Sequence, residues 1–151
     1  MRPMDGSRKD GVMSATARVV HTARTRTTGG RDHGVSRSSD GCLDVRLAAP
    51  NSDRIGTNPE HLFAAAWSAC FEYAIGLAAR QSRIALLAGV TIEAEVDLNV
   101  ADSGTFLSIR LNVSVPGVER AIAQALVDEA HRTCPYSKAT RGNMDVAIKL
   151  V

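Results

Sequence analysis

Aromatic residues and cysteines are both scarce in this sequence, and each shortage limits what the protein can be. Aromatic residues make up 4% of the chain, whereas hydrophobic residues make up 44% and much of that share is alanine. We therefore expect a core of small and branched aliphatic side chains. The three cysteines, Cys42, Cys70 and Cys134, do not make the disulfide framework of a secreted protein. A length of 151 residues suits about one domain.

The first dozen residues, MRPMDGSRKDGV, lack the apolar stretch of an export signal. We expect residues 1–12 to be a disordered extension and residues 13–151 to form a single domain. With no export signal and few cysteines, the chain is expected to be cytoplasmic, and any pairing of its thiols is expected to be redox-active.

The net charge of +2 is unevenly distributed. Residues 1–37 hold eight basic and three acidic residues, and the remainder holds ten basic and thirteen acidic. Residues 1–37 have no run of more than two adjacent basic residues and no interleaved aromatics for stacking on bases. The pattern therefore favours a solvated surface over nucleic-acid binding.

Residues 62–79, LFAAAWSACFEYAIGLAA, are long and apolar enough to suggest a membrane span. Glu72 lies near the middle of this stretch, where a lone charge would be costly in lipid. We therefore expect a central helix that is buried in protein on most sides, and no membrane partner.

The order of elements follows from hydrophobic periodicity and turn residues. Rough alternation predicts a strand over 15–27, which TTGGRD interrupts, and Asp40-Gly41 predicts a hairpin within 34–48. The central helix is expected to run from about 58 to 80. Its start is either an Asn58 cap followed by Pro59, or a capping box of Thr57 and Glu60.

The second half of the chain continues with two alternating segments, 90–100 and 105–115, that predict strands joined by the turn ADSG. Residues 118–134 have helical spacing, Pro135 ends that helix, and residues 144–151 read as a last strand. The order βββ-α-ββ-α-β predicts an α+β fold with antiparallel sheets and two main helices.

Cys70 lies in the middle of the central helix, on one stripe with Phe63, Ala66, Ala74 and Leu77. A small buried cysteine in such a dry environment is commonly an inert part of the core. Burial without a positive neighbour raises the pKa of a thiol, so a reactive Cys70 would need a cation close by.

Cys134 stands at the end of the second helix, where the helix dipole disfavours a thiolate. This position argues against Cys134 as the primary nucleophile and suits a second thiol that attacks an oxidised partner. Cys70 and Cys134 would then form a transient disulfide, with Cys42 as a bystander.

Other chemistries have weaker support. The four histidines are scattered, and neither CxxC nor HExxH occurs, so a zinc site is poorly supported. The spacing leaves a hydrolase dyad of Cys70 and His131 open, although no nucleophile motif surrounds the cysteine.

Three motifs together resemble the organic hydroperoxide resistance proteins (Ohr) of the Ohr/OsmC family. They are TTGGRD, GTNPEHLFAAAWSACF over 56–71, and AHRTCPYSKATRGNMDV over 130–146. The resemblance covers roughly residues 16–151. It implies an OsmC-like fold, an intertwined α+β homodimer with two active sites at the interface, and thiol-dependent reduction of organic hydroperoxides.

The resemblance also implies a role for four residues. Cys70 matches the peroxidatic cysteine, Cys134 the resolving cysteine, Arg31 the arginine that activates the thiolate, and Glu60 the glutamate that holds this arginine. It implies no bound cofactor, and a dihydrolipoyl group on a lipoylated partner protein as the reductant. His61, Ala66, Trp67 and the extra Cys42 depart from the family pattern and affect the expected substrate preference.

Glu60 and Cys70 are ten residues apart on one helix, which is roughly 15 Å along its axis. No side chain spans that distance, so we predict that Arg31 and Glu60 of one subunit complete the Cys70 site of the other. Three alternatives stay open: a peroxide-sensing thiol protein without turnover, a peroxidase of the OsmC branch, and a structural protein whose cysteines only fill the core.

Overall fold

The computed structural model describes residues 17–151. The extension expected over 1–12, and the beginning of the domain expected over 13–151, lie outside the described residues. The elements in chain order are β1 (Thr25–Thr28), α1 (Gly30–His33), β2 (Val35–Ser38), β3 (Asp44–Arg46), α2 (Pro59–Gln81), β4 (Thr91–Ala101), β5 (Gly104–Ser114), α3 (Arg120–Thr133), α4 (Pro135–Thr140) and β6 (Asp145–Leu150).

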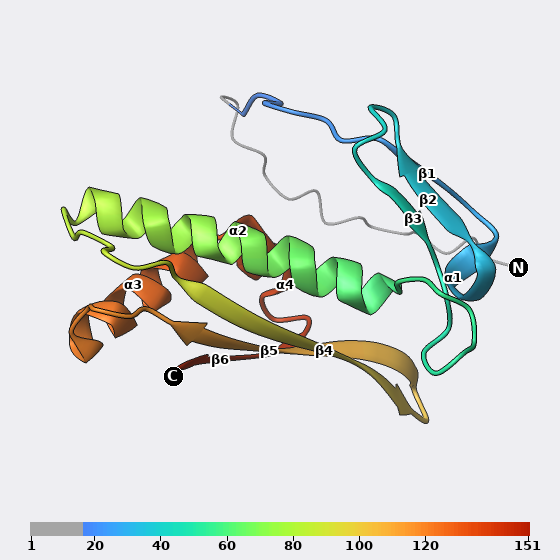
Figure 1. Cartoon of the computed structure of the whole chain (residues 1–151). Coiled ribbons are helices and arrows are strands. Elements are labelled where there is room, and N and C mark those ends of the chain that lie inside the picture. Colours follow the sequence, from blue (N-terminus) through green and yellow to red (C-terminus); the bar gives the residue numbers. More distant parts are fainter. Residues whose placement is uncertain (1–16) are drawn as a thin grey trace, which may run out of the picture.

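The strands form two sheets of three, with the orders β1-β2-β3 and β4-β5-β6. Figure 1 shows the first sheet beyond the N-terminal end of α2, while the second sheet runs along one side of this helix. The predicted α+β class is confirmed. β1 is shorter than the predicted strand over 15–27, because β2 offers only four residues to pair with it, from Ser38 opposite Thr25 to Val35 opposite Thr28.

The predicted hairpin at Asp40-Gly41 joins β2 to β3, which pair antiparallel. Asp40 Oδ1 accepts a hydrogen bond of 3.0 Å from the backbone N–H of Cys42. Gly41 has φ +76°, a conformation that glycine adopts without steric cost. The side-chain acceptor and the glycine together fold the chain back at this point.

The predicted strands over 90–100 and 105–115 are β4 and β5, which pair antiparallel from Thr91–Ser114 to Ala101–Gly104. Ile92, Ala94 and Val96 of β4 pack against the core, while the intervening glutamates are exposed. This alternation is the one that the sequence displays, since successive side chains of a strand point to opposite faces.

β6 pairs with β5 in parallel, from Ser108–Asp145 to Val113–Leu150. The second sheet is therefore mixed, and the expectation of purely antiparallel sheets is wrong at this strand. The reason is the connection: α3 and α4 lie between β5 and β6 and return the chain to the level of Ser108 in β5 before β6 begins.

α2 begins with the Asn58 cap, since Asn58 Oδ1 accepts a hydrogen bond of 2.8 Å from the N–H of His61, and Pro59 takes the first helical position. Of the two starts that the sequence allows, the structure has this one. The helix is long and apolar enough to cross a membrane by length and composition, but it contacts α3 and β4.

The buried residues of α2 all lie on one face of the helix: Trp67, Phe71, Ala74, Ile75, Ala78 and Ala79. Tyr73, on the other side, is 63% exposed. Among residues 17–151 the expectation of burial on most sides is wrong, because β4, α3 and α4 cover the helix from one side only.

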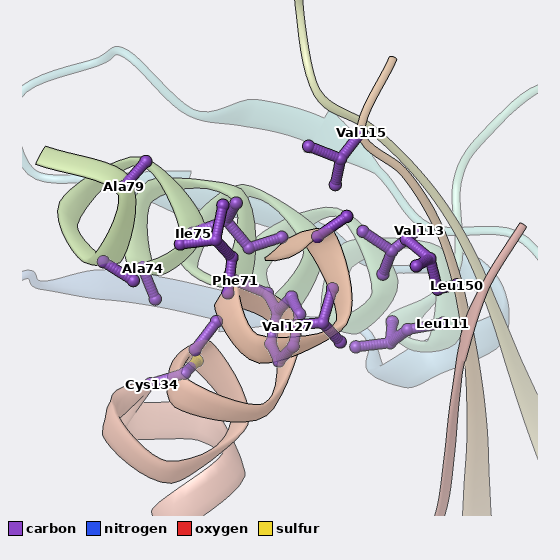
Figure 2. Packing of buried hydrophobic residues seen from close by; sticks show 14 of the residues in the cluster. Phe71, Ala74, Ile75, Ala79, Leu111, Val113, Val115, Val127, Cys134 and Leu150 are labelled. Carbon is purple, nitrogen blue, oxygen red and sulfur yellow. The ribbon is translucent and has the colours of Figure 1, made fainter. Parts of the chain in front are cut away.

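The core contains two aromatic side chains, Trp67 and Phe71, and otherwise consists mostly of alanine and branched aliphatic residues, as the composition predicts. Figure 2 shows part of it between α2, β5, α3 and β6. Cys134 belongs to the same cluster and has no exposed surface. The second sheet and its helices therefore enclose the core around one of the two candidate thiols.

Candidate active site

The TTGGRD motif forms a tight turn that presents Arg31. Gly29 and Gly30 have φ of +79° and +70°, which side-chain-bearing residues rarely adopt. A Cβ atom on Gly34 would collide with the backbone oxygens of Gly30 and Thr28. Glycines therefore allow the chain to close around α1, with Arg31 in its single turn.

Arg31 is paired with Glu60 across 29 positions of sequence. Arg31 Nη2 donates a hydrogen bond of 3.0 Å to Glu60 Oε2, and Asp32 Oδ1 lies 3.5 Å from Arg31 Nε. The Glu60 side chain is only 13% exposed, and it stands in the first turn of α2, where the helix dipole favours a carboxylate. Two of the four predicted site residues are thus held together in a charge-assisted hydrogen bond.

An open cavity of about 460 Å³ lies beside this pair. Its lining includes Arg31, Glu60 and His61, together with residues 94–98 of β4 and Arg110 of β5. Arg110 donates a 2.6 Å hydrogen bond to Glu95 and also pairs with Asp97. The cavity is therefore bounded by charged groups, and neither Cys70 nor Cys134 lines it.

Cys70 is half-buried on α2 and packs against the core. Burial raises the pKa of its thiol, and the neighbouring Cys134 raises the pKa further. No cation of residues 17–151 contributes to the pKa of Cys70. In the single chain the thiolate of Cys70 is therefore disfavoured, as expected for a buried thiol that lacks a positive neighbour.

Cys134 ends α3 and also caps α4, which begins at Pro135. Its N–H donates a 2.8 Å hydrogen bond to Ala130 O, and its carbonyl accepts one of 3.0 Å from the N–H of Lys138. The argument that a helix C-terminus disfavours its thiolate is therefore incomplete, because the N-terminus of α4 lies at the same residue. From the sequence, Pro135 is expected only to end the helix before it, whereas in the structure it occupies the first position of α4.

Three aromatic rings that sequence reasoning did not connect lie between the helices that carry the cysteines. Trp67 and Tyr136 are stacked, with ring centroids 6.1 Å apart and an interplanar angle of 26°. Phe63 meets both rings edge-on, at 5.6 and 6.1 Å. We call these three residues the aromatic cluster. The only sequence signal for it is the helical spacing of Phe63, Trp67 and Cys70.

The structure thus brings together two pairs, Arg31 with Glu60 and Cys70 with Cys134. It does not bring these pairs to each other within one chain.

His131 Nδ1 is buried without a hydrogen-bond partner among the described residues, and no hydrogen bond joins His131 to Cys70 there, so the structure gives the hydrolase dyad no support. Within residues 17–151, no group of three or more histidine, cysteine or acidic side chains is placed to hold a metal ion.

Two small sheets, a long central helix with a thiol in its middle, and a second thiol between α3 and α4 define the class: an α+β protein with a paired-thiol site. The family model described as OsmC-like protein matches residues 50–149. The chain belongs to the OsmC-like family.

Relatives with high identity carry a more specific name. The Organic hydroperoxide resistance protein of Xanthomonas axonopodis pv. citri (strain 306) is 42% identical over 142 residues, which cover 91% of this chain and 99% of the relative. The Organic hydroperoxide resistance protein OhrA of Bacillus subtilis (strain 168) is 41% identical over 136 residues, covering 87% and 96%.

Solved structures agree in fold. The crystal structure of the organic hydroperoxide resistance protein OhrB of Bacillus subtilis matches with a TM-score of 0.83 and 40% identity, covering 88% of this chain and all of the other. An organic hydroperoxide resistance protein from Elizabethkingia anophelis matches with a TM-score of 0.82 and 34% identity, covering 89% and 98%. The predicted family and OsmC-like fold are confirmed.

Proposed function

We propose that this protein is a peroxidase that reduces organic hydroperoxides to alcohols through Cys70 and Cys134. The observation that carries the proposal is the pair of neighbouring thiols, one half-buried on α2 and one fully enclosed. Family membership supports it, since relatives up to 42% identical are named for organic hydroperoxide resistance.

In the first step, the Cys70 thiolate attacks the terminal oxygen of the hydroperoxide. The O–O bond breaks, an S–O bond forms, and the leaving alkoxide takes a proton to become the alcohol. Cys70 is thereby oxidised to a sulfenic acid. Because burial and Cys134 raise the pKa of Cys70, a cation must favour the thiolate, and Arg31 is the residue that we assign to this task.

In the second step, Cys134 attacks the Cys70 sulfenic acid. A disulfide forms between the two residues and water leaves. A dihydrolipoyl group on a partner protein then reduces the disulfide by thiol exchange and is itself oxidised to the cyclic disulfide. Closeness of the two thiols before any oxidation supports this step, because little movement is needed to join them.

We further propose that the active form is a homodimer in which Arg31 and Glu60 of one subunit serve Cys70 of the other. Three observations support this arrangement. Glu60 in the first turn of α2 holds Arg31, no cation among residues 17–151 contributes to the pKa of Cys70, and the other described elements leave one side of α2 exposed.

The deciding experiment mixes the reduced protein with cumene hydroperoxide or tert-butyl hydroperoxide and follows the protein mass. A loss of two hydrogens that maps to a Cys70–Cys134 disulfide, with turnover once dihydrolipoamide is added, is the expected result. Hydrogen peroxide serves as the comparison, and we expect slower oxidation by it because the Cys70 surroundings are apolar.

Three single variants make this experiment specific. Cys70→Ser should abolish consumption of the hydroperoxide, and Cys134→Ser should stop at oxidised Cys70 without a disulfide. Cys42→Ser, which changes an exposed thiol in the β2–β3 turn, is the matched control and should behave as the unchanged protein. Disulfide formation without turnover would support a peroxide sensor instead, and no oxidation at stoichiometric hydroperoxide would support thiols that only fill the core.

A further inference from the structure

The aromatic cluster connects the two elements that carry the thiols. Trp67 lies one turn before Cys70 on α2, and Tyr136 lies two residues after Cys134 on α4. Their stacked rings therefore bridge the same two helices as the two sulfur atoms do. Phe63, one further turn back on α2, closes the cluster edge-on against both rings.

Trp67 has no exposed surface, and its Nε1 has no hydrogen-bond partner among the described residues. A buried donor without a partner is unfavourable, so hydrogen bonding by Nε1 is not the reason for a tryptophan at this position. The contribution of Trp67 is the shape and area of its ring, which a phenyl ring could replace in part.

Tyr136 is tightly linked to Cys134. α4 is a single short helix whose cap is Cys134, and the N–H of Lys138 donates to Cys134 O at 3.0 Å. Thr140 Oγ1 donates to Tyr136 O at 2.9 Å within the same helix. A shift of Tyr136 therefore carries Cys134 with it, and the stack on Trp67 limits that shift.

We infer that Trp67 and Tyr136 are positioning residues that hold Cys134 beside Cys70, so that the sulfenic acid closes to a disulfide before a second hydroperoxide reaches it. This inference rests on the proposed peroxidase function and adds a determinant of its outcome. Two reactions compete for the same sulfenic acid. Cys134 converts it to a disulfide with release of water, whereas a second hydroperoxide adds an oxygen atom, giving a sulfinic acid and one more alcohol.

The test compares Trp67→Ala and Tyr136→Ala with the unchanged protein in single-turnover mixing with cumene hydroperoxide. Formation of the sulfenic acid should keep its rate, because neither ring is needed to break the O–O bond. Disulfide formation should slow by about tenfold or more, since small misplacement of reacting groups has effects of this order. Sulfinic acid on Cys70, measured by intact mass and peptide mapping, should rise correspondingly.

Conservative variants separate positioning from a general loss of packing. Trp67→Phe and Tyr136→Phe keep a ring in the stack. Tyr136→Phe should restore disulfide formation nearly fully, and Trp67→Phe should restore it in part. Leu150→Ala is the matched control, because it truncates a buried side chain of the same core at a place away from Cys134 (Figure 2). It should lower the urea midpoint and leave the ratio of disulfide to sulfinic acid unchanged.

Failure of the positioning role can be told apart from failure of the proposed peroxidase function. If the unchanged protein forms no Cys70–Cys134 disulfide with the hydroperoxide, both are overturned. If it does, but Tyr136→Ala gives the same ratio of disulfide to sulfinic acid, the inference alone is overturned. If Trp67→Ala does not fold, Tyr136→Ala and Tyr136→Phe decide the question, because Tyr136 is only half-buried. An equal change in ratio for Leu150→Ala would also overturn the inference, since the effect would then follow stability.

Discussion

The two sheets of this protein differ in how much they contribute to the hydrophobic core. The first, β1 to β3, contributes no residue to the core cluster, and the only buried residue within its strands is Ser36. The second supplies Ile109, Leu111, Val113 and Leu150 to that cluster and packs along α2. One sheet therefore stabilises the chain that contains it, whereas the other has no apolar face of its own to bury.

The difference matters for the site, because each sheet neighbours one half of it. Arg31 stands in the turn between β1 and β2, while both thiols lie on helices packed with the second sheet. A small sheet without a core is marginal by itself. β4 forms one edge of the second sheet, and the hairpin that ends it exposes Leu98, Val100 and Phe106. We propose that the first sheet serves the partner subunit, and the predictions below test that division.

The largest expected effect is complementation between two inactive proteins. Cys70→Ser and Arg31→Ala should each be nearly inactive with organic hydroperoxides. When they are unfolded together and refolded in equal amounts, the mixture should regain about a quarter of the normal activity, because random pairing makes half of the dimers mixed and each mixed dimer has one intact site of two. Peroxide consumption with dihydrolipoamide is the measurement.

Complementation occurs only if Arg31 acts across the interface. If both residues of a site came from one chain, every site in the mixed dimer would carry one lesion and the mixture would stay inactive. Mixing Cys70→Ser with Cys134→Ser is the control, since both thiols belong to one chain and no intact site can form.

Truncation of the core should separate the two sheets in stability. Phe71→Ala removes a fully buried ring and should lower the free energy of unfolding by about 3–5 kcal/mol. Val35→Ala in β2 should cost less than about 1 kcal/mol at low protein concentration. Urea unfolding at several concentrations checks both values. A larger Val35→Ala effect at high concentration would place the first sheet in the dimer interface. Equal effects of the two variants at low concentration would contradict the view that only the second sheet stabilises its own chain.

A smaller effect is expected when the ion pair near the first sheet is broken. Glu60→Ala should leave Arg31 without its 3.0 Å partner and slow hydroperoxide reduction by about 10- to 100-fold, because Arg31 would no longer be oriented. Disulfide formation by added diamide should proceed as before. Asp32→Ala removes the more distant carboxylate and should change the rate less. An unchanged peroxidase rate in Glu60→Ala would exclude the orienting role.

The smallest effect concerns His131, which lines a cavity between α3 and β6. Burial and the nearby Arg141 lower its pKa from the ordinary value of 6.5. The folded state therefore binds the proton less readily than the unfolded chain, and His131 contributes stability that is present above pH 6.5 and is lost as the pH falls through the lowered pKa. His131→Asn should reduce the loss of stability on acidification, measured by urea unfolding at several pH values.

Local features of the sequence were predicted well where neighbouring residues decide them. Strict alternation gave β4 and β5 nearly to the residue, and Asn58 with Pro59 gave the start of α2. Four expectations differ from the structure. Of the strand expected over 15–27, the described residues before Thr25 are not in a strand. β6 runs parallel to β5, α4 follows directly on α3, and α2 is buried on one face only. Alternation carries no information on strand direction, and a proline reads equally as the end of one helix or the start of the next.

The sequence by itself determined most of the elements, the two thiols and the Arg31 motif, because periodicity, capping and glycine conformation act over a few residues. The tertiary structure alone decided three things: the pairing of Arg31 with Glu60, the closeness of Cys70 to Cys134, and the stacking of Trp67 on Tyr136. Each joins residues that are 29 or more positions apart, so it depends on how helices and sheets pack. The packing also showed that the thiols and the arginine stay apart within one chain, because the sheet near Arg31 has no apolar face to bury against the core that holds the thiols.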